Sequence, residues 1–190
     1  IPKNVLPYLQ YTSNSSYCHI YYVDLPPLIV DASIATGTPP VTPAPTATKT
    51  SDSWKTILVG GMGLGGASKI TTDTCTTGSS GYCVKTPIVD PSDTSKGLGY
   101  SSYFALDVTT PTSPKLLWEF TDPDLGYSTS GPVIIRIGDA DKNGKWFVVF
   151  ASGPAGPIDT TNRQFLGKAD LGTGKKLKLF VLDLYTGSLI

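Results

Sequence analysis

The chain alternates short runs of apolar and β-branched residues with segments rich in Gly, Pro, Ser and Thr. Runs of this length that are bounded by turn residues predict β-strands rather than helices. A tight turn is predicted at Asp139–Gly144, where turn-forming residues separate two of the runs. The predicted strands are 17–24, 28–32, 54–59, 100–108, 114–120, 131–137, 145–151 and 176–184.

Two strand formulas occur twice, in the same order. The segment 54–59 (WKTILV) returns at 146–151 (WFVVFA), and the segment 103–108 (YFALDV) returns at 179–184 (LFVLDL). Repeated runs of short strands are typical of β-propeller blades, each of which uses about four strands. We therefore predict an all-β fold in which residues 1–190 form a single domain, a partial or modified β-propeller of antiparallel blades with long polar loop insertions.

The composition supports a β fold. The chain holds one Glu and one Met but 20 Gly and 16 Pro, whereas helix interiors favour Ala, Leu, Glu, Lys and Met. The 15 basic and 15 acidic residues balance without a basic stripe, so nucleic acid is not expected as a partner. No apolar run approaches the roughly 20 residues of a membrane-spanning helix, so no transmembrane segment is expected.

Three long polar segments interrupt the strands. They are a Pro- and Thr-rich loop at 36–53, an insertion at 64–98 and a loop at 153–175. Long loops are usually functional or disordered, and in a propeller they lie on the rims. Cys75 and Cys83 bracket part of the insertion and are predicted to form a disulfide, with two free thiols as the alternative. Cys18 is then either buried or paired outside the chain.

The turn at 139–144 has the oxygen spacing of a calcium loop. Asp139, Asp141 and Asn143 stand at alternating positions, and a Gly follows at the sixth. Phe147 and Phe150 stand where such loops place a further acid, so backbone carbonyls, water or Asp159 would have to complete the ligand set. The alternative is a hairpin turn in which the Asp and Asn side chains cap their own backbone.

The sequence offers no catalytic constellation. Gly61–Gly66 matches GxGxxG but no helix pattern follows, so we interpret it as a turn where backbones approach closely. His19 is the only histidine and is predicted to be structural. Trp54, Trp118 and Trp146 occupy matching places in strands and are predicted to pack in the core. Neither catalytic residues nor an organic cofactor are predicted.

An ordered series of segments resembles the C-terminal propeller domain of the PilY family, the type IV pilus biogenesis and tip-associated adhesins. These segments are 54–66, 103–109, 117–120, 125–132, 144–153 and 179–187, and His19 with 21–24 looks like the start of that domain. Since the chain begins at Ile1 rather than Met, we expect a mature product or a segment of a longer protein.

The resemblance implies a non-enzymatic role in pilus assembly, in countering pilus retraction and in surface attachment. It implies an exported protein at the cell surface, pilus tip, outer membrane or periplasm. The implied partners are pilins and minor pilins, a host or abiotic surface, and the remaining blades of a longer chain. It also implies calcium control through an Asp-rich loop, which here maps only onto Asp139, Asp141 and Asn143, in a less acidic pattern than the family's.

Two alternatives remain open from the sequence. Quinoprotein propellers share the Leu-Asp-x-x-Thr-Gly formula, so a fragment of a quinoprotein-like dehydrogenase is the enzymatic alternative. A structural subunit of a surface filament is the other, because unpaired blade edges are templates for strand pairing.

Overall fold

The computed structural model describes residues 22–34, 44–65, 101–122, 124–153 and 177–190, with Pro2 and Ser13. For residues 89–90, 93–97, 158–159 and 164–165 it describes the backbone alone. Within these residues the regular structure is β, apart from the short 3₁₀ helix η2 (Ser51–Ser53). The all-β prediction is therefore confirmed.

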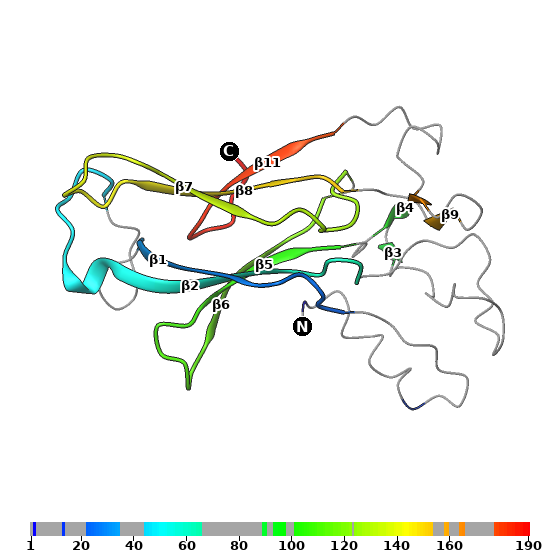
Figure 1. Ribbon diagram of the computed structural model, residues 1–190, viewed down its shortest axis with the longest axis horizontal. Coiled ribbons are helices and arrows are strands. Elements are labelled where there is room, and N and C mark those ends of the chain that lie inside the picture. The colour runs from blue at the N-terminus through cyan, green and yellow to red at the C-terminus, as the bar shows by residue number, and fades with distance from the viewer. Residues whose placement is uncertain are drawn as a thin grey trace.

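Two antiparallel sheets make up the body of the structure (Figure 1). In each of them, successive strands lie side by side, which is the arrangement of a propeller blade. The first sheet has the order β1 (Leu28–Ser33), β2 (Trp54–Gly61), β5 (Tyr103–Asp107) and β6 (Lys115–Phe120). The second has the order β7 (Val133–Ile137), β8 (Lys145–Ala151) and β11 (Leu179–Asp183).

After β11 the chain turns and runs back along it. A bridge pairs Leu182 with Leu189, and the amide of Ile190 donates to the carbonyl of Val181 at 2.9 Å. The two repeated formulas occupy equivalent places, because β2 and β8 are the second strands of their sheets and β5 and β11 are the third. The blade repeat seen in the sequence is thus a repeat of structure.

Several boundaries differ from the prediction. Strand 145–151 is as predicted, whereas β2 continues through Gly60 and Gly61, which a hydrophobicity pattern does not count as strand. Residues 22–24, predicted as the end of a strand, lack strand structure, although the amide of Asp24 donates to the carbonyl of Met62 at 3.2 Å.

The predicted loops contain further local structure. The insertion at 64–98 includes the hairpin of β3 (Val89–Asp90) and β4 (Asp93–Gly97). The loop at 153–175 includes the pair β9 (Ile158–Asp159) and β10 (Gln164–Phe165). Residues 44–53, from the loop predicted as extended, form turns and η2. Backbone groups of a second loop bind the 45–49 part, and hydrogen bonds between Thr50 and Ser53 hold η2.

The two sheets bury a common core between them. Tyr103 of β5 stacks on Phe150 of β8 with ring centroids 3.9 Å apart, and Phe120 of β6 lies 5.4 Å from Phe180 of β11. Burying one such aromatic side chain contributes roughly 1.5–3 kcal/mol. The aliphatic part of this core includes Ala32, Ile57, Val59, Val148 and Leu182.

The three tryptophans have different environments. Trp118 is buried and its indole N–H donates to the carbonyl of Leu184 at 2.9 Å, which ties β6 to the turn after β11. Trp146 is half-buried against the core. Trp54 is 39% exposed, with the ammonium of Lys49 over its ring, so the prediction that it packs in the core was wrong. It opens β2 at the edge of the structure, where few side chains can cover it.

The Gly-rich turn after β2 is a point of close approach, as interpreted from the sequence. Gly63 has φ +61°, and a Cβ there would lie 3.0 Å from the backbone of Asp24. The amides of Met62 and Gly63 both donate to the buried hydroxyl of Ser128, at 2.8 and 3.1 Å. These hydrogen bonds connect the first sheet to the segment before β7.

We predict that Gly187→Ala destabilises the chain by about 1–3 kcal/mol, because an Ala is strained at positive φ. Gly187 has φ +70°, and a Cβ there would lie 2.5 Å from Cγ of Trp118. Gly131→Ala is the matched control, since a Cβ at Gly131 meets nothing within 4 Å. Urea unfolding should show a change of less than about 0.5 kcal/mol for the control, and equal effects of the two variants would contradict the packing described here.

Candidate functional site

The candidate calcium loop is the hairpin connection between β7 and β8. Its neck is narrow, because Gly138 has φ +140°, Gly144 has φ +75°, and a Cβ on Gly138 would lie 2.8 Å from the Cα of Gly144. Only residues without a side chain fit this neck without strain. The two ends of the loop therefore lie close together at the end of the second sheet.

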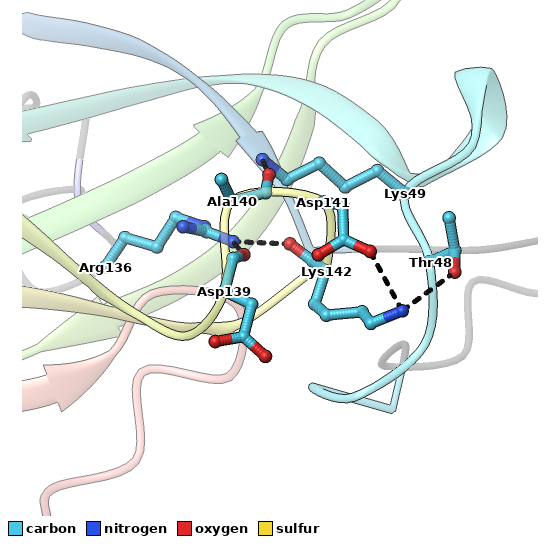
Figure 2. Close-up of polar contacts among 7 residues, drawn as sticks. All are labelled: Thr48, Lys49, Arg136, Asp139, Ala140, Asp141 and Lys142. Carbon is cyan, nitrogen blue, oxygen red and sulfur yellow. Dashed lines mark hydrogen bonds and ion pairs between the residues drawn. The ribbon is translucent and has the colours of Figure 1, made fainter.

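The two carboxylates of the predicted ligand set do not converge. Figure 2 shows the carboxylates of Asp139 and Asp141 pointing to different sides of the loop. Asp141 pairs with Nζ of Lys142 at 3.0 Å. Asn143 is buried, its Nδ2 lies 3.4 Å from the carbonyl of Ala44, and its Oδ1 has no hydrogen-bond partner.

The interior of the loop holds the guanidinium of Arg136, which extends from β7 (Figure 2). It donates to the carbonyls of Gly138 at 3.1 Å and Asn143 at 3.3 Å, and also to those of Asp139 and Lys142. Four backbone carbonyls of one loop thus converge on one positively charged side chain.

A second segment, residues 44–49, covers the outside of the loop. Nζ of Lys49 donates to the carbonyl of Ala140 at 2.8 Å, and the amide of Lys49 donates to the carbonyl of Asp141 at 3.0 Å. In return, the amides of Asn143 and Gly144 donate to the carbonyls of Ala47 and Pro45, both at 2.9 Å. Every backbone carbonyl from 138 to 143 therefore accepts a hydrogen bond from a protein donor.

This arrangement does not fit a calcium ion. Calcium takes six to eight oxygen ligands, but the loop carbonyls already serve Arg136 and Lys49, and the carboxylates of Asp139 and Asp141 point to different sides of the loop. Among the described residues, no group of three His, Cys, Asp or Glu side chains could hold a metal. Calcium binding at Asp139, Asp141 and Asn143 stays a prediction of the sequence.

Sequence reasoning missed the two cations that bind the loop carbonyls, Arg136 and Lys49. Arg136 lies two residues after Ile134 on β7 and therefore on the same, inward face of the sheet. A charged residue on that face beside a turn was a signal that could have been used. Lys49 carried no such signal, because it lies far from the loop in the sequence.

The remaining predicted site residues lie outside the described residues. These are Cys18, His19, Cys75 and Cys83, together with the side chain of Asp159. The disulfide between Cys75 and Cys83 therefore stays a prediction.

A pocket of about 260 Å³ lies beside the loop, with Lys145, Asp183 and Tyr185 in its lining. The carboxylate of Asp183 accepts from the amides of Tyr185 and Thr186, at 3.0 and 2.8 Å, so it caps the turn after β11. Burial, and secondarily the charge of Asp107, raise the pKa of Tyr185. Asp183 thus stabilises the turn, and a tyrosine of raised pKa is a poor general base at neutral pH.

Among the described residues, no helix is long and apolar enough to cross a membrane.

Asp141 generates a prediction about acid stability. Its hydrogen bond from Lys142 lowers the pKa of the carboxyl below 3.8. A lowered pKa adds stability that is present above pH 3.8 and lost as the pH falls through the folded value. We expect Asp141→Asn to be slightly less stable than the parent near neutral pH and equally stable at the acid end. Urea unfolding across this range measures the difference, and a gap that persists or widens in acid would contradict the assignment.

Comparison with known proteins finds relatives that carry the same description, although no family model matches the chain. A type IV pilus biogenesis factor PilY1 homolog of Xylella fastidiosa is 28% identical over 196 aligned positions, which cover all of this chain and 9% of that protein. The type IV pilus biogenesis factor PilY1 of Pseudomonas aeruginosa strain UCBPP-PA14 is 29% identical, over all of this chain and 11% of that protein. The crystal structure of the Pseudomonas aeruginosa PilY1 C-terminal domain aligns with all of this chain and 24% of its own, with a TM-score of 0.48 and 24% identity.

The chain spans only about a tenth of the length of these curated relatives. The similarity nevertheless extends over the whole of the chain, as the ordered motifs predicted. The resemblance of this chain to the PilY family of type IV pilus biogenesis factors is therefore confirmed.

Proposed function

We propose that this chain is a two-blade section of a type IV pilus biogenesis factor that acts in pilus assembly and surface attachment. The observation that carries the proposal is sequence similarity along the entire chain to proteins named as such factors. The location proposed with it is outside the inner membrane, at the cell surface or pilus tip. Calcium control of this role remains a prediction from the resemblance, and the loop geometry described above weighs against it.

The outward faces of both sheets support a place between further blades. On the first sheet, Ile29, Leu58, Leu106 and Leu116 stand opposite one another across all four strands. Ile29 and Leu116 are 60% and 47% exposed. Soluble domains rarely leave such apolar rows uncovered unless they mark a contact surface.

The second sheet shows the same feature. Val133, Val149 and Val181 form a row across its three strands, and Val133 is 58% exposed. Ile135 and Ile137 extend the apolar surface along β7. We propose that the remaining blades of a longer parent chain cover these faces, as blades cover one another around a propeller.

We predict that the isolated chain self-associates through the face of β7. Replacing Val133, Ile135 and Ile137 together by Thr keeps β-propensity while removing apolar surface, so it should shift the chain to monomer in size-exclusion chromatography with light scattering. The control replaces Leu64 and Leu177 by Thr, which are comparably exposed but lie outside the sheets. If the unsubstituted 190-residue chain is already monomeric, the proposal is contradicted.

The proposed role is non-enzymatic, and a redox activity would contradict it. We expect the chain, mixed with pyrroloquinoline quinone and calcium, to show no bound-quinone absorbance and no dye reduction with alcohols. A positive result would favour the quinoprotein alternative.

The function itself is tested in the organism that encodes the chain. We expect deletion of the gene to abolish surface type IV pili, and the full-length gene to restore them. The tagged parent protein should copurify with pilins or minor pilins from the sheared surface fraction. Normal piliation in the deletion strain, with no pilus component in the purified fraction, would overturn the proposal.

A further inference from the structure

We infer that Arg136 is the resident cation of the Asp139–Gly144 loop and holds the loop in its folded shape without calcium. The loop has the sequence spacing of a calcium site, but its structure is organised around a guanidinium. The inference concerns the loop alone and does not depend on the pilus role proposed above.

The backbone dipoles of the loop point at positively charged side chains. Carbonyls of Gly138, Asp139, Lys142 and Asn143 all point at Arg136, and that of Ala140 points at the ammonium of Lys49. Carbonyl oxygens carry partial negative charge, so gathering them without a cation is unfavourable. A guanidinium presents five N–H donors in a fixed fork and suits several acceptors at once.

Neighbouring side chains hold Arg136 and the carbonyl it binds in place. Its guanidinium lies 5.9 Å from the ring of Trp146, which stands opposite it in the β7–β8 register. The Trp146 indole N–H donates to the carbonyl of Asn143 at 2.9 Å, and the hydroxyl of Ser33 donates to the same oxygen at 2.9 Å. The carbonyl of Asn143 thus joins the cation, the indole and the first sheet at one point.

The loop carbonyls are already occupied by protein donors, which leaves few oxygen ligands for an ion. A calcium ion in the loop would have to displace Arg136 or Lys49 from the carbonyls, and Asn143 would have to turn its side chain out of the buried position against Ala44. Phe147 and Phe150 occupy the positions at which calcium loops place a further acid.

The experiment compares thermal unfolding of the full chain with and without calcium. The wild type should have the same Tm in EDTA and in about 5 mM calcium chloride, above the roughly 0.1–1 mM dissociation constants of extracellular calcium modules. Arg136→Met should lower Tm by about 5 °C or more, since the carbonyls of Gly138 and Lys142 lose the donor described here and those of Asp139 and Asn143 lose one of theirs. Arg136→Lys should fall between the two, because an ammonium keeps the charge but not the fork.

Lys142→Met is the matched control, because Lys142 is a cation of the same loop that pairs with the exposed Asp141. Its Tm should fall by much less than that of Arg136→Met. Two results would overturn the inference: an Arg136→Met effect no larger than the control's, or calorimetric calcium binding to the wild type that Asp139→Ala with Asp141→Ala removes. If Arg136→Met does not fold, Arg136→Lys and the calcium titration of the wild type still decide the question.

Discussion

The structure depends on the burial of two sheets against each other. Neither sheet is large enough to be stable alone, because a few short strands gain stability only when one face is covered. The stack of Tyr103 on Phe150, with Phe120 and Phe180 beside it, supplies that cover. In the same interface, the hydrogen bond from the indole of Trp118 to the carbonyl of Leu184 connects β6 to the turn after β11.

The packing of the two sheets also determines the shape of the hairpin loop between β7 and β8. Because β7 and β8 are fixed in the second sheet, Arg136 and Trp146 stand opposite each other and direct their polar ends to the same loop. Residues 44–49 then cover the loop from the side of the first sheet. The composition of this loop alone would predict mobility, but these contacts make the loop part of the packing between the sheets.

Apolar side chains on the outward faces connect this architecture to the proposed role. A sheet that is apolar on both faces is suited to a position between other layers rather than at a free surface. The curated relatives are about ten times longer than this chain, which leaves ample polypeptide for such layers in proteins of this kind.

The sequence by itself determined the fold class, the order of most strands and the resemblance to pilus biogenesis factors. Strand runs such as 54–59 and 145–151 are local patterns, and local patterns survive in any tertiary context that buries one face. It did not determine the environment of Asp139, Asp141 and Asn143, which were selected by spacing alone. Spacing fixes the distance between residues along the chain, whereas ligation requires side chains to converge in space. Only the tertiary structure placed Arg136 inside the loop and brought Lys49 to its outer side, since the contact with Lys49 joins segments far apart in the sequence.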